Sequence, residues 1–309
     1  MKGLFSAVCV VGLVSCSSFE DEAPPLAGSV QGASVEALNL FQKAQGFQAA
    51  GKTKSAIKTY KRVADRFPAD KNADEARYMQ AALLDGAGES LDAFDAYQQF
   101  IQRYPDSPRY SQALSRQEAV AHSTADGTIG TQFLGLKSDL AYKTIVGMLD
   151  KVRDNAPRAA SAPKAQFAIG QVYESKKKVA LAIDAYERLV SDYGTSGLAP
   201  EAQFRIGEIL LRSARDGNQD QANLEQAKNA YSDLLLAYPS SVFASKAKER
   251  IATIGSKDLE SSYKIAEFYR RKGQMASAAF YYQEVIDGSA PGELRNQAAA
   301  QLAKIQKAS

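Results

Sequence analysis

The sequence predicts an all-α fold, a solenoid of about six stacked helix hairpins that ends in a C-terminal capping helix. Three observations predict it. A short pattern ending in an aromatic residue or proline recurs along the chain, and a second pattern precedes each copy at a similar distance. The composition also fits, because the 309 residues include no Trp and only ten Pro, and 45% of them are hydrophobic. Such a chain suits helices with a buried core.

The recurring segment places a small residue four positions before a tyrosine. AIKTYKRVADRFP (56–68) returns 37 residues later as AFDAYQQFIQRYP (93–105), then as AIDAYERLVSDYG (182–194) and AKNAYSDLLLAYP (227–239). A fifth copy, AAFYYQEVIDGSA (278–290), lacks the closing aromatic. A spacing of four puts both residues on one face of a helix, where the small one lets a neighbouring helix approach. Pro68, Pro105 and Pro239 cannot continue a helix, so they predict its end.

A first helix is expected upstream of each copy. Its small residue is Ala44, Ala81, Gly170, Gly207 or Ala266, followed three positions later by Phe47, Leu84, Tyr173, Leu210 or Tyr269. Gly51, Gly88 and Gly273 then mark the turn between the two helices, where a left-handed conformation favours glycine. These residue types at these spacings resemble the tetratricopeptide repeat (TPR) pattern.

The pattern divides the chain into elements in order. Five clear repeats are expected at 34–68, 71–105, 161–194, 197–239 and 257–290, and a degenerate repeat lies at 107–157. The degenerate repeat should have helices over 108–121 and 138–153, separated by an inserted loop at 123–137. A second insertion is expected at 216–223. A terminal helix over 290–307 should cover the last repeat, as repeat arrays require. We therefore assign N-terminal repeats to 34–157 and C-terminal repeats with a capping helix to 158–309.

The first 33 residues read as a targeting segment and a tether. Residues 1–15 combine Lys2 with an apolar run too short to span a membrane, as in a signal peptide. LVSC (13–16) resembles a bacterial lipobox, which implies acyl chains such as palmitate on Cys16 and a lipid anchor on the periplasmic face of the outer membrane. A secretory signal that merely contains a cysteine is the alternative. Residues 16–33 predict a flexible tether.

One aromatic position is a candidate for peptide binding. The residue three positions before the small residue is aromatic in all five clear repeats: Phe41, Tyr78, Phe167, Phe204 and Tyr263. The first helices of such an array line its concave groove. These rings therefore have two interpretations. They fill the core between helices, or they form an aromatic ladder that grips an extended or aromatic-ended peptide.

The sequence lacks the residues that several functional classes require. Both cysteines, Cys9 and Cys16, fall in the first sixteen residues, and His122 is the single histidine, so neither a disulfide framework nor a zinc site of the usual ligands is expected. The sequence has no glycine-rich phosphate loop, no G-x-S-x-G elbow and no H-E-x-x-H. A net charge of +3 without a basic stripe argues against nucleic acid. We expect no enzyme activity, no metal and no cofactor.

The lipobox, the tether and the six repeats with an inserted middle one together resemble the BamD family, the TPR lipoprotein of the outer-membrane β-barrel assembly machine. The segments DLESSYKIAEFYRRKGQMASAAFYYQEVI (258–286) and FIQRYPDSPRYSQA (100–113) carry the most specific likeness. The chain exceeds the family's usual length by about one repeat. The resemblance implies that the C-terminal repeats dock a β-barrel assembly protein through its periplasmic domains, with Tyr269, Arg270 and Arg271 as candidate contacts. It also implies that the N-terminal repeats meet unfolded outer-membrane proteins.

A different periplasmic adaptor is the second hypothesis, one that coordinates cell-wall synthesis with division like the CpoB/YbgF group. Those proteins usually begin with a heptad coiled coil, whereas residues 17–33 contain no heptads. Two basic runs, residues 176–178 and 270–272, also have two interpretations. They complement the negative ends of helix dipoles, or they contact an acidic surface or anionic lipid headgroups.

Overall fold

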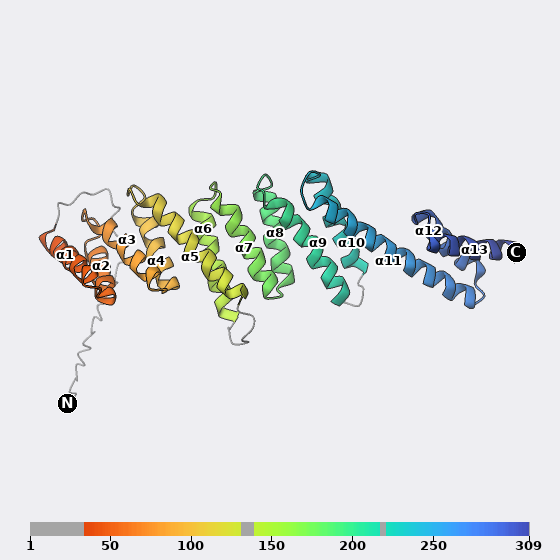
Figure 1. The fold of residues 1–309 in the computed structure, drawn as a ribbon, viewed down its shortest axis with the longest axis horizontal. Coiled ribbons are helices and arrows are strands. Elements are labelled where there is room, and N and C mark those ends of the chain that lie inside the picture. The colour runs from red at the N-terminus through yellow and green to blue at the C-terminus, as the bar shows by residue number, and fades with distance from the viewer. Residues whose placement is uncertain (1–33, 131–138, 217–220, 309) are drawn as a thin grey trace, which may run out of the picture.

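The computed structural model describes residues 34–130, 139–216 and 221–308. Within these ranges the chain forms thirteen α-helices and no strand. Consecutive helices pack on one another in chain order, from α1 on α2 to α12 on α13, and the array is elongated with its first and last helices at opposite ends (Figure 1). The predicted all-α solenoid with a C-terminal capping helix is confirmed.

The helices form six hairpins followed by α13, and each hairpin has a first and a second helix. The bounds are α1 Val35–Ala49, α2 Thr53–Arg66, α3 Ala73–Gly86, α4 Ser90–Arg103, α5 Tyr110–Gly130, α6 Asp139–Asn155, α7 Ser161–Ser175, α8 Val179–Asp192, α9 Ala199–Asp216, α10 Gln221–Ala237, α11 Ala244–Arg271, α12 Met275–Gly288 and α13 Glu293–Ala308.

The recurring tyrosine is the centre of each clear hairpin. Its side chain is at most 1% exposed in all five cases, at Tyr60, Tyr97, Tyr186, Tyr231 and Tyr282. The small residue of the facing helix makes room for the ring. A Cβ added to Gly170 would lie 2.5 Å from a ring carbon of Tyr186, and one added to Gly207 would lie equally close to Tyr231. The small-residue pattern therefore reflects direct contact between helix backbone and ring.

Four of the turns between the two helices of a hairpin contain a residue whose backbone is in the left-handed conformation. Gly51, Gly88 and Gly273 have φ values of 68°, 77° and 77°, a region that glycine enters without steric cost. In the α7–α8 turn the equivalent residue is Lys177, with a φ of 54°. A side chain in this region costs about 1–2 kcal/mol relative to the right-handed conformation.

The third hairpin differs from its prediction. The inserted loop is expected from residue 123, but α5 remains helical to Gly130, and the rest of the expected loop lies outside the described residues. Ala125 is buried, and the hydroxyls of Ser123 and Thr124 donate to the carbonyl of Val120 at 3.0 and 2.7 Å. Because Val120, Ala121 and Ala125 are buried, packing continues the helix through a stretch whose glycine and threonine content favours a loop.

The second expected insertion, at 216–223, is also shorter than predicted. Helix α9 extends to Asp216 and α10 already begins at Gln221, so only residues 217–220 remain, and these lie outside the described ranges. The terminal helix begins three residues later than predicted, at Glu293. Ala298, Leu302 and Ile305 of α13 are buried with Val285 of α12, so this helix covers the last hairpin.

Helix α11 departs most from the repeat pattern. The fifth clear repeat is expected to begin near residue 257, yet α11 is one helix of 28 residues from Ala244 to Arg271. Its first part joins the core of α9 and α10 through Ala247 and Ile254, and its last part packs on α12 through Ala266. The first part corresponds to the start of α9, with Glu249 where α9 has Phe204. It is thus a first helix without a second helix of its own.

The predicted signal peptide, the lipidated Cys16 and the tether lie outside the described residues. Within the described ranges, no helix has both the length and the apolar character needed to cross a bilayer.

Candidate partner-binding surfaces

The structure places each of the five predicted groove aromatics against the tyrosine of its own hairpin. The ring centroids are 5.5 to 5.9 Å apart in the pairs Phe41–Tyr60, Tyr78–Tyr97, Phe167–Tyr186 and Phe204–Tyr231, and in Tyr263–Tyr282. Tilted and edge-on arrangements of this kind stabilise a core. Within the described residues, no ring contact links one of the five aromatics to another.

The five aromatics differ in how much of the ring reaches solvent. Phe41, Tyr78 and Phe167 are 8%, 5% and 7% exposed, whereas Phe204 and Tyr263 are partly exposed. An arginine of the next hairpin covers two of the buried rings: the guanidinium of Arg109, just before α5, lies over Tyr78 at 4.7 Å, and that of Arg205 in α9 lies over Phe167 at 5.3 Å. Peptide binding by these positions stays a prediction, and it has most room at the two partly exposed rings.

The hydroxyl of each of the five recurring tyrosines meets an acidic or amide side chain of the facing helix. Tyr231 donates to Glu208 at 2.6 Å and Tyr186 donates to Glu174 at 3.1 Å. An arginine of the following hairpin then reaches the same carboxylate. Arg250 Nε lies 2.7 Å from Glu208, and Arg212 Nη2 lies 2.8 Å from Glu174. These bonds connect the interior of one repeat to the surface of the next.

These contacts shift the titration of the groups involved. Burial and the neighbouring carboxylates raise the pKa of Tyr186 and Tyr231 well above the usual tyrosine value, and they raise the pKa of Tyr97 to about 12. Burial alone would raise the pKa of Glu208, but hydrogen bonds from Arg250 and Tyr231 hold it below its ordinary value. The carboxylate of Glu208 is therefore ionised near neutral pH.

The last hairpin carries a row of aromatic side chains on its outside. Tyr269 of α11 stacks on Tyr281 of α12 with ring centroids 5.7 Å apart and planes 8° apart. Phe268 extends the row at one end and Phe280 at the other, with centroids 5.6 and 5.3 Å from their neighbours. Phe268 is 50% exposed and Phe280 is 67% exposed. We name these four residues the C-terminal aromatic row.

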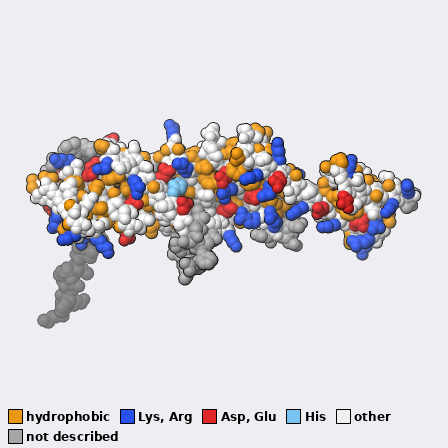
Figure 2. Space-filling model, viewed as in Figure 1, with side chains coloured by type: hydrophobic (Ala, Val, Ile, Leu, Met, Phe, Trp, Pro, Cys, Tyr) orange, Lys and Arg blue, Asp and Glu red, His pale blue; other side chains and the backbone are white. Residues whose placement is uncertain are grey.

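Two further apolar side chains, Ile265 and Met275, are 38% and 44% exposed on the same two helices. In Figure 2 the C-terminal end of the array is set apart from the rest and is joined to it by a narrower waist. Exposed aromatic and aliphatic groups gathered on one hairpin are typical of a surface that binds another protein.

Of the predicted docking residues, one belongs to this row and two follow it in α11. Tyr269 is one of its four rings. The guanidinium of Arg270 binds Glu267 at 2.8 Å, and that hydrogen bond raises the pKa of Arg270. Arg271 Nε lies 3.3 Å from the backbone oxygen of Glu267. Their contact with a partner stays a prediction.

Sequence reasoning missed Phe268, Phe280 and Tyr281. The run Phe280-Tyr281-Tyr282 contained the signal, because successive residues of a helix point in different directions and three adjacent large rings cannot all be fully buried in one hairpin core. Tyr282 is the fully buried one, at 0% exposure, and Tyr281 packs at the edge of the same core. Phe280 is left exposed, which is unusual for a phenylalanine.

No group of three or more metal-ligating side chains is found in the described part of the chain. His122 is partly buried, and burial lowers its pKa.

Comparison with solved structures returns many helical-repeat proteins at low identity. A thermophilic TPR protein of Thermus thermophilus has 17% identity, with 71% of this chain and 98% of that chain covered, and a TM-score of 0.33. MamA of Desulfovibrio magneticus RS-1 has 16% identity, coverages of 68% and 98%, and a TM-score of 0.32. No curated protein sequence matches the chain.

Two sequence families match, and their ranges follow the hairpins. Residues 39–70 and 75–107 each match the tetratricopeptide repeat, and they cover most of the first two hairpins. Residues 136–304, more than half of the chain, match the YfiO family, which is described as outer membrane lipoprotein and is the BamD type. The chain therefore belongs to the YfiO family of outer membrane lipoproteins and is a TPR protein of outer-membrane assembly.

Proposed function

We propose that this protein is a lipid-anchored scaffold on the periplasmic face of the outer membrane, which holds a β-barrel assembly protein and unfolded barrel substrates together. In this proposal Cys16 carries the lipid and residues 16–33 form the tether. The repeats at 34–157 bind unfolded substrates, and the repeats at 158–309 bind the barrel partner. The protein binds and positions its partners and carries out no reaction. It has no nucleic-acid partner.

The C-terminal aromatic row is the observation that best supports this proposal. Its exposed rings lie at the end of the array, on the segment that resembles the family most specifically. Tyr269 is one of these rings, and Arg270 and Arg271 follow it on α11, so an apolar centre with a charged border is available to the periplasmic domains of the barrel partner.

Substrate binding belongs to the groove lined by the first helices. Phe204 and Tyr263 are the two groove aromatics whose rings are partly exposed, so they are the stronger candidates for stacking against an extended, aromatic-ended chain. Phe41, Tyr78 and Phe167 contribute mainly to the packed core behind that surface, because less than a tenth of each side chain is exposed.

Crosslinking in cells tests the docking proposal. A photoreactive amino acid in place of Phe280 should capture a barrel protein that has soluble periplasmic domains. Leu236 on α10 is the matched control, because it is 85% exposed but lies away from the aromatic row. Equal capture from both positions would contradict docking at the row. Capture of cell-wall synthases or division proteins from position 280 would instead support the adaptor hypothesis.

The lipid anchor has a separate test. A Cys16→Ala protein should be released into the periplasmic fraction or stay unprocessed, because no acyl chain can be attached. A processed Cys16→Ala protein that still sediments with outer membranes would contradict lipidation at this residue.

A further inference from the structure

The edge of the solenoid that carries the turns within hairpins also carries a series of grooves. Each groove lies between the start of a second helix and the first helix of the following hairpin. One is formed by α2 and α3 around Ile57 and Leu83, another by α8 and α9 around Val179 and Ile209, and a third by α10 and α11 around Leu224 and Ile254. The repeat geometry therefore creates equivalent cavities, and the side chains at each decide what it can bind.

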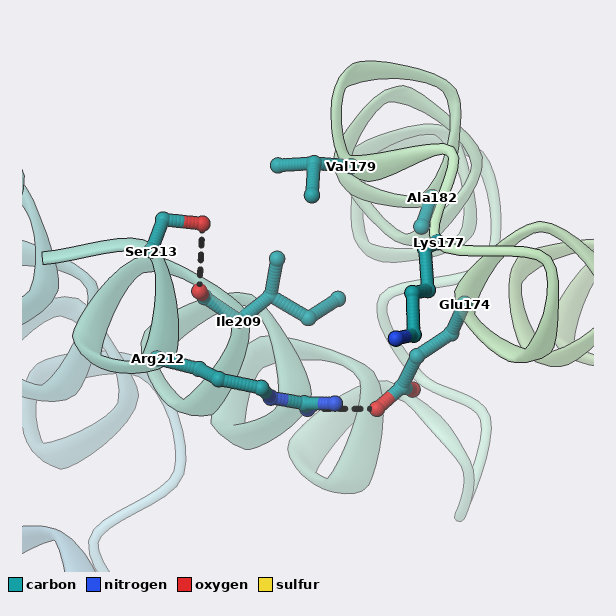
Figure 3. Close-up of a pocket in the computed structure, with 7 residues that line it drawn as sticks. All are labelled: Glu174, Lys177, Val179, Ala182, Ile209, Arg212 and Ser213. Atoms are coloured by element: carbon teal, nitrogen blue, oxygen red, sulfur yellow. Dashed lines mark hydrogen bonds and ion pairs between the residues drawn. The ribbon is translucent and has the colours of Figure 1, made fainter. Parts of the chain in front are cut away.

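The groove between α8 and α9 has the composition of a binding site for an anion. Val179, Ala182 and Ile209 form an apolar wall around about 180 Å³ of accessible space, and the head groups of Lys177 and Arg212 lie at one end (Figure 3). Lys and Arg side chains also gather over α9 on the face shown in Figure 2. At the position equivalent to Arg212, the α2–α3 groove has Gly86, and the α10–α11 groove has Lys257 followed by Asp258.

The one carboxylate at this groove is already bound. Glu174 Oε1 accepts from Arg212 at 2.8 Å, while Oε2 accepts from Tyr186 at 3.1 Å and from Arg205 at 3.3 Å. Within the described residues, the ammonium of Lys177 makes no ion pair. The groove thus keeps positive charge that the protein itself does not neutralise.

Lys177 also occupies a backbone position that disfavours a side chain. Its φ of 54° corresponds to the glycines at 51, 88 and 273 in the other turns. The other three turns have glycine at this position, so the lysine strains the backbone here. Such strain is typically retained at functional sites. The neighbouring Lys176 and Lys178 have ordinary φ values of −91° and −87°, so a charge at the end of α7 could be supplied without strain.

We propose that this groove binds a segment of a partner protein in which a carboxylate side chain adjoins an aliphatic one. The carboxylate pairs with Lys177 and Arg212, and the aliphatic group fills the space beside Val179 and Ile209. A peptide fits better than a membrane because the cavity is recessed between hairpins and has an apolar wall, which a lipid headgroup would leave unused. This site is separate from the C-terminal aromatic row and goes beyond the proposed function.

Methyl NMR of the whole protein tests the site directly. The probes are the peptides Ac-Ser-Glu-Leu-Ser-amide and Ac-Ser-Gln-Leu-Ser-amide, which differ only in charge. The acidic peptide should shift the methyl signals of Val179 and Ile209 in a saturable way, and the neutral peptide should bind at least tenfold more weakly. Absence of a shift at both residues, or equal binding of the two peptides, would overturn the proposal.

The variant Lys177→Gly separates binding from folding. It restores the residue of the other turns, so its midpoint of thermal unfolding should rise by about 2 °C, while affinity for the acidic peptide falls at least fivefold. Lys176→Gln is the matched control and should keep the wild-type affinity. Unchanged affinity in Lys177→Gly contradicts the site.

A binding assay with vesicles that contain anionic lipid distinguishes a peptide from a membrane. If the protein bound these vesicles through Lys177 and did not bind the acidic peptide, the groove would be a membrane contact and the proposal would be wrong.

Discussion

Gly207 lies so close to Tyr231 that even a methyl group has no room. The ring of Tyr231 is fully buried and its hydroxyl is bonded to Glu208, so it cannot easily move away. The glycine at this position is therefore required for packing, whereas Gly46 on the exposed side of α1 has no atom within 4 Å of an added Cβ.

Gly207→Ala should lower the free energy of unfolding by about 1–3 kcal/mol, the usual cost of overpacking a core. Gly46→Ala is the control, and it should raise the free energy of unfolding by about 0.5–1 kcal/mol because alanine stabilises a helix interior. Denaturant titration followed by circular dichroism measures both. A Gly207→Ala protein as stable as Gly46→Ala would show that the close approach is not real.

Glu208 makes stability depend on pH. Its pKa is below the ordinary value in the folded protein, so its contribution is complete above the unfolded value of about 4.3 and is lost as the pH falls through the lower, folded value. Glu208→Gln should therefore show a smaller fall in unfolding midpoint between pH 7 and pH 3 than the wild type. Glu249→Gln removes the same charge at an exposed site on α11 and should keep the wild-type dependence. Parallel curves for all three proteins would contradict the assignment.

At the scale of elements, the sequence predicted the hairpins well because their pattern depends on direct contacts. A buried tyrosine, a small residue opposite it and a glycine in the turn each follow from local geometry. Sequence reasoning did not predict α11, because the first part of this helix keeps the small residues Ala244 and Ala247 of an ordinary first helix. Only the loss of an aromatic at Glu249 marks the missing second helix. The aromatic row was missed because its rings adjoin the repeat positions and resemble core residues in sequence.

Helix α13 covers the apolar face of the last hairpin. A protein truncated after Gly288 loses Ala298, Leu302 and Ile305, which are packed in that core. Amide hydrogen exchange should then speed up throughout α12 and in α11 from Ala266 onward, while α1 to α4 keep their protection, because repeats depend on their immediate neighbours. Unchanged exchange in α12 would show that α13 is not a structural cap.

At the scale of the whole molecule, the structure is an elongated array whose two ends offer different surfaces. Core clusters continue from α1 to α11, and a separate cluster joins the end of α11 to α12 and α13. The proposed docking surface lies on this last cluster, and the groove at Lys177 lies in the middle of the array. A scaffold with distinct surfaces along its length can hold different partners at the same time.

Binding of purified proteins tests the docking surface most directly. The measurement is calorimetric titration of this protein with the isolated periplasmic domains of the β-barrel assembly protein. Phe268→Ser combined with Phe280→Ser should weaken binding at least tenfold, because both exposed rings are lost from the centre of the interface. Leu236→Ser combined with Val242→Ser removes similarly exposed apolar groups elsewhere and should leave affinity unchanged. Wild-type affinity in the double phenylalanine variant would contradict the account.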